Sequence, residues 1–495
     1  MNKSGELRMN IDRRLLYISF VAFVIYVLYL FFGPSYVSYP LPTYTEEEAL
    51  EAIQEEVKKL GLEPITKENL EYSDIIANSS IGRYIDHKKL TEDELKELQK
   101  EVTIQSFEIS SYDLTYSYDM ERNRLTKAEN IILVQDADQF VREYFGKQYE
   151  LKGKDTQLKD EPLAFGDSKK TYVAPTKFPE IINVVDIYLI GETIVAFEQY
   201  GLARGFPEVG TTLFEIITSL FVLLILLGLV VFATIHLIIK LFKKQIEFSW
   251  GPLLLTAAAG IGWVFISIGL GGSLTFFNLI EPAIMIYLTF VTLVIRWKRS
   301  TRTIKDRLRD LQPSVIHGFS LMIIAIVLAE AFFYVASFFD TWASPVTTYM
   351  LLVKLDVWMI PIFTLFIGLS AAVTEESVFR NYLIPIFDRV GILFSLIMTS
   401  FLWGVLHIGY DMYPWYLYVL EFLIVTGPLF YFVYKRYGFS AAIFLHYFYN
   451  AWVTTLFLFI VDIKVAIVSL FVMLSPFLLF LIRKKDSPQQ SVFHK

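Results

Sequence analysis

The chain has 495 residues, of which 54% are hydrophobic and 16% aromatic, and its formal net charge at neutral pH is -7. Soluble globular proteins have fewer apolar residues, because these mostly fill one compact core. The chain contains no cysteine, which excludes disulfides, thiolate metal sites and cysteine nucleophiles. The composition therefore predicts a polytopic membrane protein.

Apolar stretches close to or above the roughly 20 residues that cross a bilayer recur along the chain. We expect ten transmembrane helices, near residues 15–33, 214–239, 252–271, 274–295, 315–338, 354–373, 391–408, 415–434, 439–461 and 463–482. Clusters of Lys and Arg precede the first span and follow the second, fourth, sixth, eighth and tenth. Since basic loops stay in the cytoplasm, both termini should be cytoplasmic.

The first apolar segment has the basic start of a signal peptide, but its apolar run is long and no small-residue cleavage site follows. We expect a retained anchor that delivers residues 34–210 to the outside. This segment has 34 Asp or Glu against 20 Lys or Arg, which argues against nucleic acid as a partner. An outer domain without disulfides fits a bacterial surface, so the expected location is a bacterial plasma membrane.

The outer segment is too long and too patterned to be a loop. Thr45 with Glu48, and Thr91 with Glu94, have the spacing of capping boxes at helix starts. Alternating stretches follow at 102–118 and at 182–201, the second with a turn at Gly191. These patterns predict an α+β domain, and no motif in it identifies a ligand.

The expected fold class is thus an all-α polytopic membrane helical bundle of about ten transmembrane helices, with an inserted α+β extracytoplasmic domain. Its parts are a cytoplasmic N-terminus (1–14), the first anchor (15–33), the extracytoplasmic domain (34–210), accessory transmembrane helices with a basic cytoplasmic loop (211–314), a candidate catalytic core (315–482) and a cytoplasmic tail (483–495).

Ionisable residues within apolar helices are costly and commonly functional. The core contains five ionisable candidates and one amide: Glu375, Glu376, Arg380, His407, His446 and Asn450. Residues four apart share a helix face, so Glu376 is expected to pair with Arg380, while His446 and Asn450 point the same way. Taken singly, each residue is more readily explained as structural; their occurrence together predicts a site.

Two kinds of chemistry fit these residue types. A buried glutamate beside imidazole can take a proton from water, while a second histidine and an amide stabilise an oxyanion. Alternatively, Glu375, His407, His446 and Asn450 could bind Zn²⁺, whose open position would hold an activated water. The sequence does not separate a glutamate-type enzyme without a cofactor from a metalloprotease. In either case Glu376 and Arg380 are expected to support the site.

The motifs Glu375-Glu376-x-x-x-Arg380, x-x-x-His407 and His446-x-x-x-Asn450 resemble those of the CPBP family of intramembrane proteases, which includes CAAX prenyl endopeptidases and bacteriocin-processing enzymes. The resemblance covers about residues 320–480 and implies an intramembrane endopeptidase. By this resemblance Glu375 and His407 activate the water, and His446 and Asn450 contact the oxyanion or a metal. Trp403 stands where the family usually has Phe, so we expect a reshaped pocket.

The resemblance also implies a membrane-embedded or lipid-anchored peptide as substrate, with the lipid bilayer as the setting. Two other functions are compatible with the sequence. One is a catalytically inactive membrane scaffold or immunity protein of the same fold, although every motif residue is present. The other is a proton-coupled transporter, although no second copy of the motifs indicates an internal repeat. The oligomeric state is not predicted.

Overall fold

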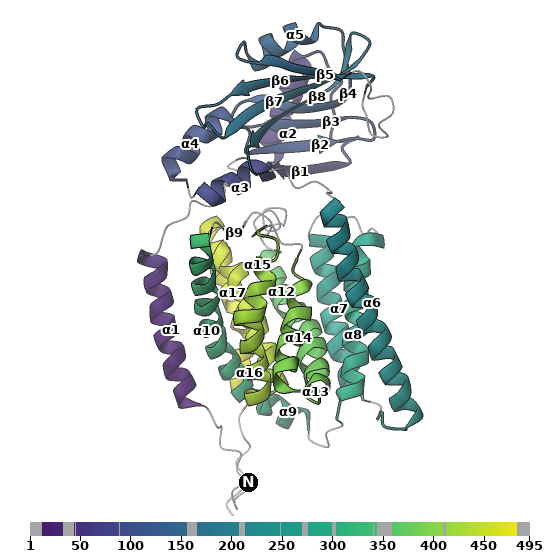
Figure 1. The fold of residues 1–495 in the computed structure, drawn as a ribbon, viewed down its shortest axis with the longest axis vertical. Helices are drawn as coiled ribbons and strands as arrows, with labels where there is room; N and C mark the ends of the chain where they lie inside the picture. The colour runs from purple at the N-terminus through teal and green to yellow at the C-terminus, as the bar shows by residue number, and fades with distance from the viewer. Residues whose placement is uncertain are drawn as a thin grey trace, which may run out of the picture. The chain divides into compact units, whose positions relative to one another are not determined.

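The structure is a computed structural model that describes residues 12–32, 44, 46–88, 90–155, 166–206, 213–247, 249–269, 276–298, 303–339, 341–343, 359–408 and 412–482. The chain divides into two compact units. The helical unit comprises residues 1–33, 213–341 and 347–495, and the sheet unit comprises residues 34–212 and 342–346. Figure 1 shows the helices and strands of both units.

The helical unit contains α1 (Arg13–Phe32), α6 (Leu213–Phe242), α7 (Trp250–Gly269), α8 (Phe276–Arg296), α9 (Ile304–Asp310), α10 (Gln312–Ala336), α12 (Ile360–Glu375), α13 (Ile384–Phe387), α14 (Ile392–Val405), α15 (Leu417–Glu421), α16 (Gly427–Tyr437), α17 (Phe439–Val461) and α18 (Ile463–Met473). Two π-helices, η4 (Glu376–Leu383) and η5 (Phe422–Thr426), join α12 to α13 and α15 to α16. The 3-10 helices η3 (Ser337–Phe339) and η6 (Ser475–Leu481) and the short strand β10 (Met412–Tyr413) complete this unit.

Helical structure is present at each of the ten predicted spans. By length and composition, the described residues include four helical stretches that could cross a membrane, and a bent pair would make a fifth. The four are Leu220–Phe242, Ile304–Phe339, Ile360–Phe387 and Leu417–Tyr437, and the pair is Ile463–Met473 with Ser475–Leu481. The apolar helices fit a multi-pass membrane protein. The count of ten spans is not confirmed, and the termini, residues 1–11 and 483–495, lie outside the described residues.

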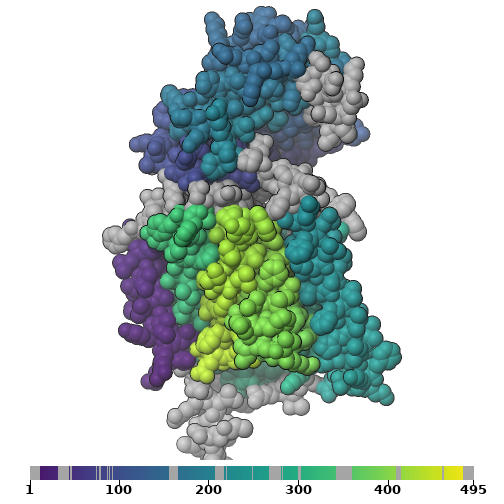
Figure 2. Space-filling view, viewed as in Figure 1, coloured from purple at the N-terminus to yellow at the C-terminus, as the bar shows by residue number. Residues whose placement is uncertain are grey.

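Helix α17 is the centre of the helical unit, because it packs against α10, α12 and α18. Its Leu445 and Phe448 are fully buried, as expected for a helix that is apolar on all sides. Gly318 allows α10 to approach closely, since a Cβ atom there would lie 2.7 Å from the backbone nitrogen of Leu445. On the face shown in Figure 2, α1 and the accessory helices α6–α8 lie at opposite flanks of this core.

Each of the two π-helices of the helical unit lies just before a proline. The residues four positions before Pro385 and Pro428 are Asn381 and Ile424, which lie inside η4 and η5. A proline removes one backbone donor, and its ring crowds the carbonyl four residues earlier. The wider π turn relieves this conflict without ending the helix. It also sets the rotation of Glu376 and Arg380, which both belong to η4.

The sheet unit contains α2 (Glu46–Lys59), α3 (Ser79–Lys88), α4 (Glu92–Glu101), α5 (Ala137–Phe140) and the π-helix η1 (Val141–Phe145). Its strands are β1 (Tyr72–Ala77), β2 (Gln105–Ser110), β3 (Thr115–Asp119), β4 (Arg124–Leu133), β5 (Glu150–Asp155), β6 (Ser168–Pro175), β7 (Ile181–Ile190), β8 (Thr193–Ala203) and β9 (Trp342–Ala343). Strands β1 to β8 form one antiparallel sheet in the order β1-β2-β3-β4-β8-β7-β6-β5.

The sheet buries one face against helices. Ile53 and Val57 of α2 share a core with Phe107, Tyr116 and Phe197 of the sheet. This arrangement follows from alternation, because every second side chain of a strand points to the same face.

The local predictions for this unit are confirmed where the structure describes them. Strands β7 and β8 pair as a hairpin whose turn contains Gly191 with φ +61°. Thr91 and Glu94 form the predicted capping box at the start of α4. Thr45, the first residue of the other predicted box, lies outside the described residues.

Candidate active site

The candidate residues come from three helical regions of one core. Glu375 ends α12, and Glu376 and Arg380 follow in η4. His407 lies just past the end of α14, and His446 and Asn450 belong to α17. Because α12 packs against α17, and η4 packs against both α14 and α17, the fold brings together residues that are 70 positions apart in the sequence.

Glu376 is the most deeply buried member, with 0% of its side chain exposed, and it has two charged or polar neighbours. Arg380 Nη1 lies 3.3 Å from Glu376 Oε1, and only 2% of the arginine side chain is exposed. His446 Nδ1 lies 2.9 Å from the same oxygen. The predicted pairing of Glu376 with Arg380 is present, and Glu376 additionally fixes the orientation of the His446 ring.

Glu375 has a different environment from its neighbour. Its side chain is 12% exposed, and its Oε2 lies 3.9 Å from His446 Nε2, which is beyond hydrogen-bond length. The same oxygen accepts a hydrogen bond from the indole Nε1 of Trp403. Of the two adjacent carboxylates, Glu375 is therefore the one that a water molecule or a substrate can reach.

His407 is oriented by the backbone of its own helix. Its Nδ1 lies 3.0 Å from the carbonyl oxygen of Trp403, and its ring centre lies 4.5 Å from that of Phe422. A carbonyl can only accept, so Nδ1 carries a proton, and in the neutral form of the ring the lone pair is then on Nε2. This tautomer can accept a proton from a water molecule.

Asn450 lies one helical turn beyond His446 in α17 and is half-buried. Its backbone carbonyl accepts a hydrogen bond from Thr454 at 3.0 Å. The spacing of four residues keeps Asn450 on the same helix face as His446, as predicted from the sequence.

Trp403 is the residue whose role the sequence reasoning missed, because it predicted only a reshaped pocket. The Trp403 side chain is 2% exposed, and the guanidinium carbon of Arg380 lies 3.5 Å from the centre of its ring. Its ring centre lies 5.6 Å from that of His446. The sequence contained a signal for this role, because Trp stands four residues before His407 where the family usually has Phe. Unlike Phe, Trp has a hydrogen-bond donor in its side chain.

Among the described residues, no three His, Cys, Asp or Glu side chains are grouped so that they could hold a metal ion. His446 Nε2 lies 3.9 Å from Glu375 Oε2, which accepts from Trp403, and His446 Nδ1 faces Glu376. The predicted Zn²⁺ alternative remains a prediction, and no chemical step is derived through it.

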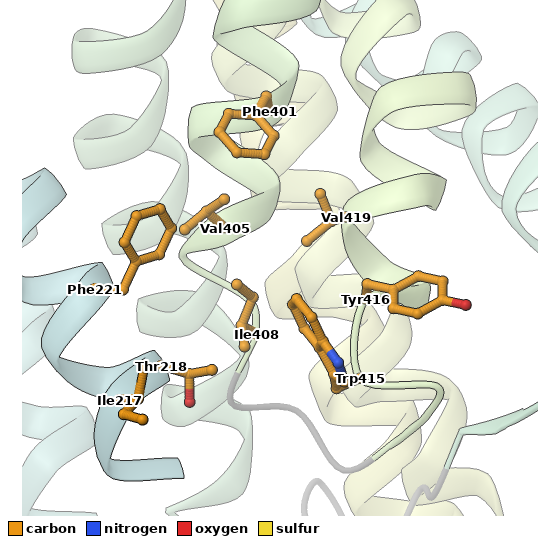
Figure 3. Close-up of a pocket in the computed structure, with 9 residues that line it drawn as sticks. All are labelled: Ile217, Thr218, Phe221, Phe401, Val405, Ile408, Trp415, Tyr416 and Val419. Carbon is orange, nitrogen blue, oxygen red and sulfur yellow. The ribbon is translucent and has the colours of Figure 1, made fainter. Parts of the chain in front are cut away.

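An apolar cavity of about 430 Å³ lies between α6, α14 and α15, as Figure 3 shows. Phe401 and Val405 of α14 line it, as does Ile408 just beyond the end of this helix. At 100° per residue, Phe401 and Val405 lie on the side of α14 opposite to Trp403. The cavity is therefore separate from the candidate active site.

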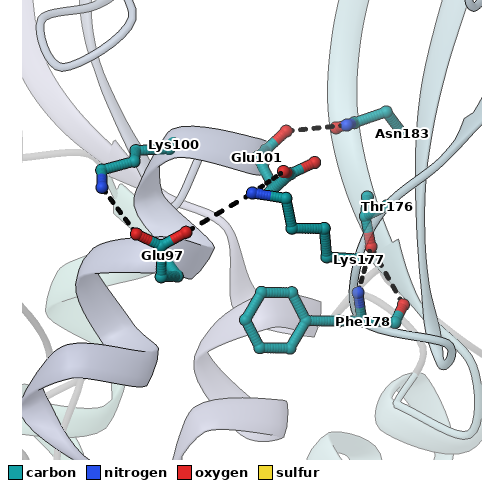
Figure 4. Close-up of polar contacts among 7 residues, drawn as sticks. All are labelled: Glu97, Lys100, Glu101, Thr176, Lys177, Phe178 and Asn183. Carbon is teal, nitrogen blue, oxygen red and sulfur yellow. Dashed lines mark hydrogen bonds and ion pairs between the residues drawn. The ribbon is translucent and has the colours of Figure 1, made fainter.

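A second group of charged residues, in the sheet unit, has a structural explanation (Figure 4). Lys177 Nζ lies 3.5 Å from Glu97 Oε2 and 3.3 Å from Glu101 Oε1, and Asn183 donates to the backbone carbonyl of Glu101. These contacts attach α4 to the connection between β6 and β7. Since 69% of the Lys177 side chain is exposed, the ion pairs contribute little stability.

The helical unit fits a multi-pass membrane protein whose apolar helices bury two glutamates, an arginine and a histidine close together. Residues 357–452 match the family model described as type II CAAX prenyl endopeptidase Rce1-like. The match confirms the resemblance seen in the sequence, and the family that it describes implies a protease. No curated protein matches the chain, and no solved structure does either.

Proposed function

We propose that this protein is an intramembrane endopeptidase that hydrolyses peptide bonds of membrane-embedded or lipid-anchored peptides. The observation that carries the proposal is the buried contact of Glu376 with Arg380 and His446, beside the more accessible Glu375, inside the family-matched segment. An isolated buried charge is costly, so a cluster of four ionisable groups among apolar helices indicates a function.

In the proposed reaction Glu375 is the general base. It takes a proton from a water molecule, and the resulting hydroxide attacks the carbonyl carbon of the scissile peptide bond. His407 shares the activation of the water through its unprotonated Nε2. The proton held by Glu375 then passes to the leaving amine, and the peptide C–N bond breaks.

His446 and Asn450 are proposed to stabilise the oxyanion of the tetrahedral intermediate. The contact with Glu376 holds His446 by Nδ1 and leaves Nε2 to donate when it carries a proton. With Glu375 and Glu376 ionised and Arg380 charged, a protonated His446 makes the group neutral. A neutral group lowers the cost of burying four ionisable side chains.

The family match favours a CAAX-type substrate, whereas processing of bacteriocins or other peptides is the alternative within the same chemistry. We further propose a bacterial plasma membrane as the location, with both termini cytoplasmic and residues 34–210 outside. A metal-bound water in place of the glutamate base is the alternative mechanism.

The test is cleavage of membrane peptides by the purified full chain in lipid vesicles, with a farnesylated CAAX-type peptide among the probes. Glu375→Gln and His446→Ala should each lower kcat/KM by about 10²-fold or more, the effect expected for removal of a general base or an oxyanion donor. Glu421→Gln is the matched control, because this glutamate is also buried, at 2% exposure, but contacts Thr426.

Equal cleavage by wild type, Glu375→Gln and Glu421→Gln would contradict the assignment of Glu375. Absence of cleavage by the wild type over the whole set of probes would favour the non-enzymatic scaffold. Retention of activity in the presence of a chelator would support the glutamate mechanism over the metal-dependent one.

A further inference from the structure

Trp403 contacts more members of the candidate active site than its position in the sequence suggests. Its indole N–H donates to Glu375 Oε2, and its backbone carbonyl accepts from His407 Nδ1. One face of its ring carries the Arg380 guanidinium at 3.5 Å. A single residue thus holds both groups of the proposed water-activating pair.

The indole N–H has a specific consequence for Glu375. A carboxylate has two oxygens, and the one that accepts from Trp403 is also the one nearest to His446 Nε2. Oε1 is then the oxygen available to a water molecule. The bond also restricts rotation of the carboxylate plane, so that this oxygen keeps one direction.

The surroundings of Trp403 make its position well determined. Its ring centre lies 4.3 Å from that of Phe422 and 5.0 Å from that of Phe430, and the Arg380 guanidinium carbon also lies 4.8 Å from the Phe430 ring centre. Aromatic pairs and a desolvated cation over a ring are each stabilising. The indole N–H therefore points at Glu375 because the ring cannot turn easily.

We propose that Trp403 is a positioning residue of the peptidase reaction, which orients Glu375 through its indole N–H and His407 through its backbone carbonyl. The inference rests on the proposed function for its kinetic part. The geometric part, the hydrogen bond to Glu375, is testable without any substrate. The side chain does not itself contact the reacting atoms; it acts through Glu375.

The kinetic test replaces Trp403 by benzothienylalanine, an isostere in which sulfur takes the place of the indole N–H, and separately by Phe. Both substitutions keep an aromatic face for Arg380 and remove the donor. Cleavage of the farnesylated CAAX-type peptide in phosphatidylcholine–phosphatidylglycerol vesicles should show kcat lowered at least tenfold with KM changed less than twofold. A misplaced catalytic group costs up to about 10²-fold in rate without weakening substrate binding.

Trp452→Phe is the matched control, because Trp452 is on α17 like His446 and packs at 6.3 Å on Tyr26 rather than against Glu375. This control should keep kcat within about twofold of wild type. A kcat lowered less than tenfold by the isostere overturns the proposal, since a role in packing alone would survive the isosteric exchange. An equal loss of kcat in Trp452→Phe overturns it as well.

The independent readout is the indole N–H band of Trp403 in ultraviolet resonance Raman spectra, isolated as the difference between wild type and Trp403→Phe. We expect the band of a strongly hydrogen-bonded indole, and a shift towards weaker bonding when the same difference is taken in the Glu375→Gln background. A band at the same position in the wild-type and Glu375→Gln backgrounds overturns the hydrogen bond between Trp403 and Glu375. If the wild type cleaves no probe, the proposed function fails, and this comparison still decides the role of Trp403 towards Glu375.

Discussion

Removal of the Arg380 charge should destabilise the helical unit strongly. Arg380→Met keeps most of the apolar length of the side chain but leaves Glu376 buried without its cation. The two charged atoms are 3.3 Å apart, and the side chains are 2% and 0% exposed. At an effective dielectric constant of about 20, this distance corresponds to a Coulomb attraction of about 5 kcal/mol.

The expected loss is smaller than the full attraction, because His446 still contacts Glu376 in the variant. Removal of one partner of a buried ion pair typically costs about 3–5 kcal/mol, and the contact of Arg380 with the Trp403 ring is lost as well. We therefore expect the free energy of unfolding to fall by about 3–5 kcal/mol. The double variant Arg380→Met/Glu376→Gln should be less destabilised than Arg380→Met alone, since no uncompensated charge is left.

The assay is reversible unfolding of the purified protein in mixed micelles, followed by circular dichroism. Lys435→Met is the matched control, because Lys435 pairs with Asp388 at 2.7 Å but its side chain is 46% exposed. This variant should lose less than about 1 kcal/mol. A loss below about 1 kcal/mol for Arg380→Met, or additive losses in the double variant, would refute the reasoning that the buried pair stabilises the site.

Two further predictions concern a buried carboxylate and a close helix contact. Burial raises the pKa of Asp119 to about 7, above the ordinary value of 3.8, so the folded sheet unit holds an extra proton between about pH 4 and pH 7. The contribution of Asp119 to the stability of this unit should be most favourable below about pH 4, fall by at most about 4 kcal/mol as the pH rises to 7, and change little above that. Asp119→Asn should remove this dependence, measured in the full chain by hydrogen exchange of β3 and β4 amides after correction for intrinsic rates; an unchanged pH slope in the variant would contradict the assignment. Gly318→Ala should cost about 1–3 kcal/mol in the micelle assay, because the new Cβ would lie 2.5 Å from Phe444 Cβ. Gly228→Ala is its control, since nothing lies within 4 Å of that position; equal stability of the two variants would show that α10 and α17 are not tightly packed.

The agreement between sequence and structure is best for features that depend on neighbouring residues. The capping box of Thr91 and Glu94 and the hairpin with its turn at Gly191 involve residues within a short stretch, and both are present. Apolar runs likewise predicted helices at all ten expected positions. The number of these helices that cross a membrane remained open, since several apolar helices are only 10–17 residues long within the described part of the chain.

The sheet order is a feature that local patterns do not contain. Strand β4 pairs with β8 rather than with β5, and β5 lies at the edge beyond β6. Alternation of apolar and polar residues shows that a segment is a strand, but it does not identify the partner. Pairing depends on which faces are buried together in the folded unit.

For the candidate site, the sequence by itself determined which ionisable residues lie in apolar helices, and that Glu376 and Arg380 share a face, because helix periodicity requires it. Only the tertiary structure decided that His446 contacts Glu376 more closely than Glu375, and that the Trp403 indole N–H reaches Glu375. These contacts join α12, η4, α14 and α17, and they depend on how far each helix is rotated against its neighbours. Helix rotation is set by packing of the whole core, including the π-helix at 376–383, so no local pattern could have predicted it.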